Sequence, residues 1–309
     1  MKTAFLFPGQ GAQAVGMGAD LYESYDVYRD AFDACEQQAG LDLKSACFEG
    51  KGMDDSGMIQ AAIYTHTVSL LKTVRSLGGS ADVFAGLSLG EYGALVAAGV
   101  LDAPRGAALV YRRGTIMDGA VPPGTGGMLS VVGLTLKQVE TCIAASEHVY
   151  VSNHLNETQT VLGGLLPELE EVKPTLEAAG ARMVSLLAMK GPSHCPLLND
   201  AAARFASVLE SERMGAVGKT VYSNVLGAPY PTDADVRALL CEQMRSRVRW
   251  HDCVEHMLND GVTRFVEIGP GNVLSKMLKR RVGAGVEVYS VSNVASLDAF
   301  LSAIEGGGK

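Results

Sequence analysis

The sequence lacks any apolar run close to the roughly 20 residues that a membrane-spanning helix needs. Its first residues, "MKTAFLFPGQG", are not typical of a signal peptide, because Pro8 and Gly9 interrupt the apolar stretch too early. Both absences argue against a membrane-bound or exported protein. We therefore expect a cytoplasmic location and no membrane partner.

Positive charge is also scarce. The chain has 26 Lys and Arg against 34 Asp and Glu, a formal net charge of -8, which repels polyphosphate and argues against a nucleic-acid partner. Of the 309 residues, 47% are hydrophobic and 19% charged, which favours a folded chain with a large core over disorder. The length suits one sizeable domain, or a large domain that carries a smaller one.

No C-x-x-C pair occurs among the cysteines, which argues against a zinc knuckle and a disulfide frame and favours reduced thiols. The segment "HDCVEH" holds His251 and His256, but a spacing of five does not put both rings on one helix face, as the i, i+4 pair of a zinc helix does. We therefore expect no metal and no other cofactor. The six cysteines are Cys35, Cys47, Cys142, Cys195, Cys241 and Cys253.

Three short apolar runs end in glycine-rich loops: "TAFLFPGQG", "DVFAGLS" and "TRFVEIGPG". Each is typical of a buried strand that feeds a tight loop. Stretches with helical periodicity, such as 58–76, lie between them, which favours an α/β body with a parallel sheet and helical crossovers. Because sites in such sheets gather at the carboxyl ends of the strands, we expect the three loops to meet there.

The middle of the chain has a different order, βαββαβ, which is typical of a ferredoxin-like domain. We predict that residues 125–189 form such a small domain, inserted between the linkers "VPPGTGG" and "KGPSH". The large domain then consists of 1–124 and 190–309, with a cleft between the two bodies. The expected strands are 126–134, 148–155, 159–164 and 181–189, and the expected helices are 135–146 and 166–180.

Ser88 lies in the pattern G-x-S-x-G, formed with Gly86 and Gly90. The glycines allow a turn too tight for larger side chains, which presents the hydroxyl at the sheet edge. Such a turn also places the Leu89 amide at a helix N-terminus, where unpaired N–H groups favour an oxyanion. A nucleophile is one interpretation, and a helix N-cap serine is the other. The spacing alone leaves both open.

A serine nucleophile needs a base, and the chain has six histidines. His194 is the favoured candidate, because "GPSHCPLL" returns the chain from the inserted segment to the cleft. A lone histidine is more often a surface or core residue than a catalytic one. The other five lie in expected helices or in the small domain: His66, His148, His154, His251 and His256.

Five segments, in order, resemble the malonyl-CoA:acyl carrier protein transacylases of fatty-acid and polyketide synthesis. They are "FPGQGAQ" (7–13), "GLSLGEY" (86–92), "YRRGTIM" (111–117), "PSHCPLL" (192–198) and "VEIGPGNVL" (266–274). The resemblance runs from residue 3 to about residue 282 with the family's spacing. It implies a hydrolase-like α/β body with a ferredoxin-like insert, the layout that the periodicity also predicts.

The resemblance implies that Ser88 attacks the thioester of malonyl-CoA while His194 takes its proton. The resulting malonyl-serine is then attacked by the phosphopantetheine thiol of an acyl carrier protein. The backbone amides of Gln10 and Leu89 would hold the oxyanion. A backbone carbonyl near Ser246 would orient the histidine, although Ser246-Arg247 stands where the family usually has Asn-Pro.

Arg113 is the expected partner of the free malonyl carboxylate, because its planar fork can bind both carboxylate oxygens. It shares a predicted helix face with Leu109 and Met117, while Arg112 points elsewhere. The alternative for Arg113 is an ordinary surface ion pair. The resemblance places Gln60 in the same pocket, and the alternative is an exposed helix glutamine.

Two positions depart from the family. Leu87 stands where histidine is most frequent, and Leu155 replaces an asparagine, so both reduce the polarity near the cleft. Asn153 and Gln159 match their family positions, and Asn153 is expected to contact substrate. Cys195, beside His194, is interpreted as a packed small residue rather than a second nucleophile.

Two further functions use the same residues. A malonyl-CoA hydrolase would have the same serine and histidine in a wetter site, and a docking scaffold would keep the fold without activity. An acidic carrier protein would need a local basic surface on this acidic chain. The candidate surfaces are Arg245, Arg247 and Arg249, and the run Lys276–Arg281, each of which is otherwise a solvated helix face.

Overall fold

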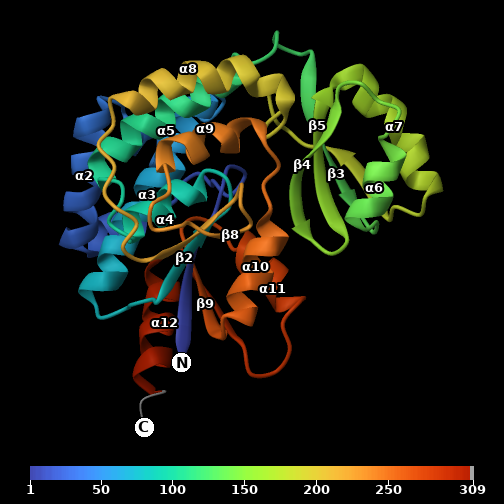
Figure 1. The fold of residues 1–309 in the computed structure, drawn as a ribbon. Coiled ribbons are helices and arrows are strands. Elements are labelled where there is room, and N and C mark those ends of the chain that lie inside the picture. The colour runs from blue at the N-terminus through green and yellow to red at the C-terminus, as the bar shows by residue number, and fades with distance from the viewer. Residues whose placement is uncertain (307–309) are drawn as a thin grey trace.

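The computed structural model describes residues 1–306 and contains a six-stranded sheet in the order β10-β9-β1-β2-β7-β8 (Figure 1). All neighbours pair in parallel except β7 and β8, which are antiparallel at one edge. This confirms the predicted parallel sheet. The strands are β1 (Lys2–Phe7), β2 (Val83–Gly86), β7 (Thr220–Ser223), β8 (Ala228–Pro229), β9 (Val262–Ile268) and β10 (Glu287–Val291).

Alternation along β1 explains why both faces of this sheet are covered. Phe5 and Phe7 pack into one apolar core and Ala4 and Leu6 into another, and all four side chains are fully buried. The first core is shared with α2 (Asp26–Ala39), α3 (Ser56–Ser76), α5 (Ala103–Asp118), α8 (Asn199–Glu210) and α9 (Val236–Arg245). The second is closed by α10 (Trp250–Asn259) and α11 (Val273–Lys279).

The remaining helices are shorter or peripheral: α1 (Ala19–Ser24), α4 (Gly90–Ala97), α12 (Val294–Gly306), a π-helical turn at Ser45–Glu49 and a 3-10 turn at Pro196–Leu198. Among the described helices, none combines the length and the apolar character that crossing a membrane requires.

A second sheet has four antiparallel strands in the order β4-β5-β3-β6. The chain order is the predicted βαββαβ. Leu129 and Leu162 on one face share an apolar core with Val139 of one helix and with Leu169 and Leu176 of another. The elements are β3 (Gly126–Val132), α6 (Leu136–Cys142), β4 (Val149–Asn156), β5 (Gln159–Leu165), α7 (Leu166–Ala178) and β6 (Met183–Leu186).

Two of these elements are shorter than predicted. The helix expected over 135–146 ends at Cys142, and the strand expected over 181–189 covers only Met183–Leu186. β6 pairs along Leu129–Val132 of β3, and the Leu187 amide donates one further bond to the Met128 carbonyl before the chain turns toward the larger sheet. Residues 187 and 189 line a pocket there instead of extending the strand.

We propose that residues 125–189 form a separate small domain, because all four strands of the second sheet lie within this segment. Backbone hydrogen bonds join it to the rest of the chain. The His154 amide donates to the Val248 carbonyl at 2.9 Å, and the Val248 amide donates to the Ser152 carbonyl at 2.8 Å. β4 therefore lies against the segment that enters α10, as Figure 1 shows.

The carboxyl ends of β1, β2 and β9 meet at one edge of the large sheet, as predicted. Phe7 and Gly86, the last residues of β1 and β2, are register partners, and the Leu87 amide donates to the Phe7 carbonyl at 3.0 Å. The loops after β1 and β2 and the start of α11 line one pocket, which the small sheet borders from the other side.

Candidate active site

Ser88 lies on a strained turn between β2 and α4. Its φ of 54° is in the left-handed region, which non-glycine residues rarely adopt. Both flanking glycines are needed: a Cβ on Gly86 would lie 1.9 Å from the Gly90 carbonyl carbon, and one on Gly90 would lie 2.0 Å from the Phe7 carbonyl oxygen. The sequence therefore forms the sharp turn that the G-x-S-x-G spacing predicts.

Asn224 holds this turn from the loop after β7. Its Oδ1 accepts from the Ser88 amide at 2.6 Å, and its Nδ2 donates to the Gly86 carbonyl at 2.7 Å. The Ser88 side chain does not cap α4, whose N-cap is Leu89 and which has no side-chain cap. The N-cap interpretation of Ser88 is thus wrong, and the hydroxyl is left for another partner.

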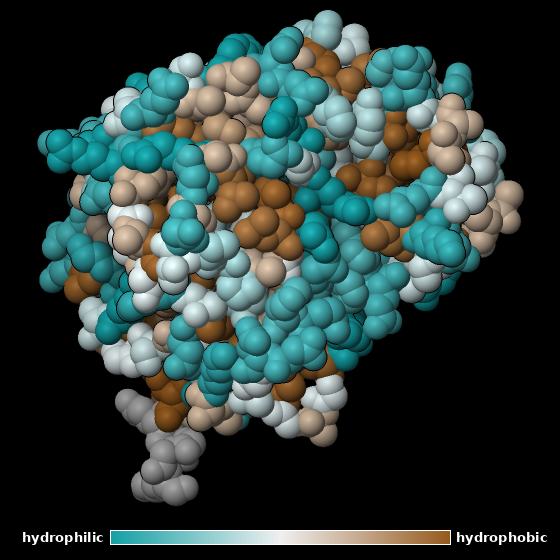
Figure 2. All heavy atoms as spheres, in the orientation of Figure 1, coloured by the Kyte–Doolittle hydropathy of each residue, from teal (hydrophilic) through white to brown (hydrophobic). Residues whose placement is uncertain are grey.

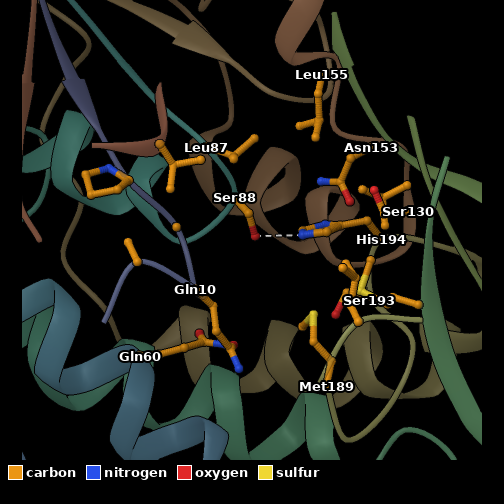
Figure 3. A pocket seen from close by; sticks show the side chains of 18 of the residues that line it. Gln10, Gln60, Leu87, Ser88, Ser130, Asn153, Leu155, Met189, Ser193 and His194 are labelled. Carbon is orange, nitrogen blue, oxygen red and sulfur yellow. Dashed lines mark hydrogen bonds between the residues drawn. The ribbon is translucent and has the colours of Figure 1, made fainter. Parts of the chain in front are cut away.

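That partner is His194, whose Nε2 lies 2.6 Å from Ser88 Oγ (Figure 3). The other ring nitrogen, Nδ1, lies 2.6 Å from the main-chain carbonyl oxygen of Gln243. Because a carbonyl can only accept, Nδ1 carries the hydrogen, and the Nε2 lone pair faces the serine hydroxyl. This is the orientation in which a histidine can take the proton of a serine.

The orienting carbonyl corrects the prediction for Ser246. Gln243 lies in the last turn of α9, where main-chain carbonyls have no partner within the helix and can accept from outside it. Ser246 follows the helix, and its hydroxyl bonds to the carboxylate of Glu242. Its side chain is not among the residues that line the pocket. The prediction was displaced by three residues along the chain.

Burial and the nearby charge of Arg113 lower the pKa of His194 from its ordinary value of 6.5 to about 3. The His194 side chain is 3% exposed, so a charged imidazolium would lose its hydration. The ring is therefore neutral near pH 7, the state in which Nε2 can accept a proton.

Arg113 extends its guanidinium into the same pocket from α5. Nη2 lies 3.1 Å from Ser88 Oγ and 2.9 Å from Gln243 Oε1, and Nη1 lies 2.8 Å from Gln60 Oε1. Arg113 and Gln60 are each 1% exposed, so the surface ion pair and the exposed glutamine are both wrong. Arg112, its neighbour, is exposed, as the helix spacing predicts.

The arginine charge has no carboxylate partner in the protein. Across residues 1–304, no carboxylate oxygen lies within 4.0 Å of an Arg113 nitrogen. Its bonds go to amide oxygens and to the serine hydroxyl, which are neutral acceptors. A buried and unpaired positive charge is costly, so the pocket is suited to a ligand that brings a negative charge.

The pocket around Ser88 collects the other predicted residues. Gln10, Leu87 and Asn153 line it, and so do the matching Gln159 and the departing Leu155. Figure 3 shows Leu87 and Leu155 on one side of Ser88, and Gln10, Gln60 and Met189 on the other. The two leucines make one wall apolar, as their replacement of polar family residues predicts.

The amides of Gln10 and Leu89 are available for an incoming oxygen. Neither N–H donates a hydrogen bond within the described part of the chain. The amides of Ser88 and Gly90, on either side of Leu89, do donate. Leu89 also precedes α4, whose N-terminus favours negative charge. We propose that these two amides form an oxyanion hole, because neither already donates a hydrogen bond.

Sequence reasoning missed Gln243, Asn224 and Glu91. Gln243 and Asn224 carry no local motif, since their roles depend on contacts with residues more than 45 positions away. Glu91 stands within "GLSLGEY", but a buried carboxylate has no signature distinct from an exposed helix residue. Cys195 is buried and burial raises its pKa to about 12, which agrees with a packed residue rather than a nucleophile.

The other histidines lie outside this pocket. His66 is buried in α3 with its Nδ1 2.6 Å from the Tyr28 hydroxyl, and the rings of His154 and His251 contact each other at a centroid distance of 4.7 Å. His148 pairs with Glu168 at the surface of the small sheet. Of the six histidines, the structure therefore brings His194 to Ser88, which is the histidine that the sequence analysis favoured as the base.

Comparison with known proteins gives one consistent result. The family described as "Acyl transferase domain" matches residues 4–297. A malonyl CoA-acyl carrier protein transacylase of Haemophilus influenzae is 36% identical over 305 residues, which cover 96% of this chain and 97% of the relative.

Two solved structures show the same likeness in three dimensions. A malonyl CoA-acyl carrier protein transacylase from Clostridium perfringens superposes with a TM-score of 0.95 at 32% identity, covering 99% of this chain and 98% of the other. A malonyl-transacylase in complex with its type II PKS acyl-carrier protein superposes with a TM-score of 0.93 at 34% identity, covering 98% and 100%.

The low pKa of His194 predicts that its ring stays neutral from about pH 8 down to about pH 5. As the pH falls below 6.5, the unfolded chain takes up this proton first, so the stability that neutral His194 contributes declines toward pH 3. NMR of histidine-labelled protein, with His194→Ala to assign the signal, should show no titration of this ring above about pH 5. A midpoint near the ordinary value would contradict the proposed environment.

Proposed function

Since this chain belongs to the acyl transferase domain family, we propose that it is a malonyl-CoA:acyl carrier protein transacylase. It moves a malonyl group from coenzyme A to the phosphopantetheine thiol of an acyl carrier protein. One observation carries the proposal: the contact between Ser88 Oγ and His194 Nε2 lies in the same pocket as the buried and unpaired charge of Arg113. The pair supplies acyl-transfer chemistry, and the charge selects an anionic acyl group.

In the first half-reaction, Ser88 Oγ attacks the thioester carbonyl of malonyl-CoA while its proton moves to His194 Nε2. The amides of Gln10 and Leu89 donate to the oxygen that becomes negatively charged. When the tetrahedral intermediate collapses, the carbon–sulfur bond breaks and His194 returns the proton to the coenzyme A sulfur. A malonyl-serine ester remains on the enzyme.

In the second half-reaction, the carrier's thiol gives its proton to His194 and attacks the ester carbonyl. The same two amides stabilise the second oxyanion. The ester bond to Ser88 then breaks, and the proton returns from His194 to Oγ. The enzyme is restored, so the two substrates bind in turn at one site.

The malonyl carboxylate is proposed to pair with Arg113. The guanidinium already lies 3.1 Å from the oxygen that carries the acyl group, so an acyl chain of malonyl length stays within its reach. Asn153, which lines the pocket and lies beside His194 in Figure 3, is the proposed further contact to substrate. An acetyl group offers no charge to Arg113 and should be a poorer substrate.

Hydrolysis is the reaction that this pocket disfavours. Leu87 and Leu155 present apolar surface beside Ser88, together with Met128, Val161 and Met189. Water at such a wall finds few hydrogen-bond partners, so the malonyl-serine should persist until the thiol arrives. The location is proposed to be cytoplasmic, which the six free cysteines support because reduced thiols are typical of that compartment.

The proposed function is tested by following malonyl-CoA consumption with and without phosphopantetheinylated carrier protein. A transacylase forms malonyl-carrier and releases little free malonate in either case. A hydrolase releases malonate at a similar rate whether or not the carrier is present. An inactive scaffold neither consumes malonyl-CoA nor forms malonyl-carrier.

Arg113→Ala should lower kcat/KM for malonyl transfer by a factor on the order of 100, because a charge-assisted pair to the carboxylate is lost. Acetyl transfer should fall much less or rise, since the buried charge no longer penalises a neutral acyl group. The measurement is the ratio of kcat/KM for the two acyl-CoAs, with the exposed Arg112→Ala as the matched control. A parallel fall in both reactions would show that Arg113 is not the selector.

The carrier is proposed to dock at α11. Lys276, Lys279 and Arg280 are exposed and form no ion pair within the described residues, while Val273 and Leu274 of the same helix line the pocket. The alternative surface is already neutralised, because Arg245, Arg247 and Arg249 pair with Glu242, Glu140 and Asp252. Figure 2 shows a largely hydrophilic surface where α10 and α11 lie in Figure 1.

Charge reversal at Lys276, Lys279 and Arg280 should raise KM for carrier protein at least about threefold and leave KM for malonyl-CoA nearly unchanged. The reason is that rim charges guide the acidic partner rather than the reaction. Steady-state kinetics with each substrate varied in turn gives the two constants. The control is Lys219→Glu, which changes an exposed lysine just before the amino end of β7, whereas the pocket lies at the carboxyl end of the sheet. Equal effects on both constants would contradict this docking surface.

A further inference from the structure

Glu91 is a buried carboxylate that the two half-reactions do not use. It lies in the first turn of α4, three residues after Ser88, and is 1% exposed. It forms no ion pair with any side chain of residues 1–304 and does not line the pocket. It therefore cannot touch substrate, and any effect on the reaction must pass through its neighbours.

Those neighbours all donate hydrogen bonds to the carboxylate. The Tyr230 hydroxyl donates to Oε1, and Gln243 Nε2 lies 2.5 Å from Oε2. The main-chain nitrogen of Asn224 lies 3.3 Å from Oε1 and 3.2 Å from Oε2. A site built from donors alone accepts a carboxylate and rejects a group that presents hydrogens.

Gln243 connects this carboxylate to the reacting groups. Its Nε2 donates to Glu91 and, at 3.0 Å, to the Ser88 carbonyl, while its Oε1 accepts from Arg113 Nη2 at 2.9 Å. Its main-chain carbonyl accepts from His194 Nδ1 at 2.6 Å. One residue thus contacts the nucleophile, the base and the arginine.

Glu91 acts together with the Ser88 carbonyl and Arg113 to fix which end of the Gln243 amide faces each partner. Because a carboxylate only accepts, the NH₂ end must point to Glu91, which turns Oε1 toward Arg113. With the amide reversed, NH₂ would face the guanidinium donors and Oε1 would face both the Glu91 carboxylate and the Ser88 carbonyl. The reversed arrangement leaves three buried contacts between like groups.

We propose that Glu91 is a positioning residue for acyl selection: through Gln243 it holds the Arg113 guanidinium beside Ser88 and supplies the negative charge that balances it across one intervening amide. The inference rests on the proposed function, since it concerns how Arg113 favours an anionic acyl group. Arg113 stays free of a direct carboxylate partner, so that its donors remain available to the substrate.

The ionisation of Glu91 depends on pH near neutrality, because two opposing effects act on its carboxyl group. Burial raises its pKa to about 7, while the bonds from Tyr230, Gln243 and Asn224 and the charge of Arg113 act in the opposite direction. Near pH 7 the group is therefore about half ionised, and the acceptor-only carboxylate that orients Gln243 becomes the main form as the pH rises above 7.

The test is Glu91→Gln, which keeps the shape of the side chain and replaces one oxygen by NH₂. The kcat/KM ratio for malonyl-CoA over acetyl-CoA should fall at least about tenfold, because Arg113 loses its fixed acceptor or its balancing charge. Glu23→Gln is the matched control, since it makes the same change at an exposed glutamate of α1, and its ratio should stay within about threefold of the wild-type value. A wild-type ratio in Glu91→Gln would overturn the proposal.

Two further variants separate this effect from loss of structure. In an Arg113→Ala background, Glu91→Gln should not change the ratio further, and the same additional fall would show that Glu91 does not act through Arg113. If Glu91→Gln does not fold, Gln243→Leu decides, because it removes the connecting amide and keeps the main-chain carbonyl. A wild-type ratio in Gln243→Leu would likewise overturn the proposal.

The wild-type enzyme, measured in parallel, distinguishes a failure of the proposed function from a failure of the role of Glu91. If the wild type forms no malonyl-enzyme, the proposed function fails. If the wild type forms malonyl-enzyme and the variants keep its selectivity, only the role of Glu91 fails.

Discussion

The hydrogen bond between Ser88 and His194 is the interaction on which the rest of this site depends. It joins residues 106 positions apart, one on the turn after β2 and one on the loop that returns from the small sheet. Both have a positive φ, 54° and 56°, a conformation that costs free energy in a non-glycine residue. Asn224 holds the serine, and the Met244 carbonyl accepts from the His194 amide at 3.0 Å, so surrounding contacts maintain both strained residues.

Burial of charge is the second constraint, and the fold meets it by keeping two buried side chains of opposite charge apart. Arg113 and Glu91 have opposite charges and are both buried, yet the side-chain amide of Gln243 lies between them. A direct ion pair would satisfy the arginine and remove the reason for an anion to enter. Because the amide keeps the charges apart, the pocket retains a positive charge toward substrate and the protein retains its overall balance.

Much of this arrangement could be predicted from the sequence, because it depends on local spacing. The glycines around Ser88, the helix face that carries Arg113 and the βαββαβ order each follow from periodicity or sterics within a few residues. Gln243 and Asn224 could not be found this way, because their partners are set by the packing of α9 and the loop after β7. The error at Ser246 has the same origin: several carbonyls at the end of a helix lack partners, and only tertiary packing decides which one the histidine meets.

The proposed function requires that Ser88 Oγ carries the acyl group between the two substrates. Intact-mass analysis after brief mixing with malonyl-CoA, followed by peptide mapping, tests it most directly. We expect one malonyl group per chain, located on Ser88, absent in Ser88→Ala and formed much more slowly in His194→Ala. An adduct on another residue such as Cys195, or rapid malonyl transfer by Ser88→Ala, would contradict it.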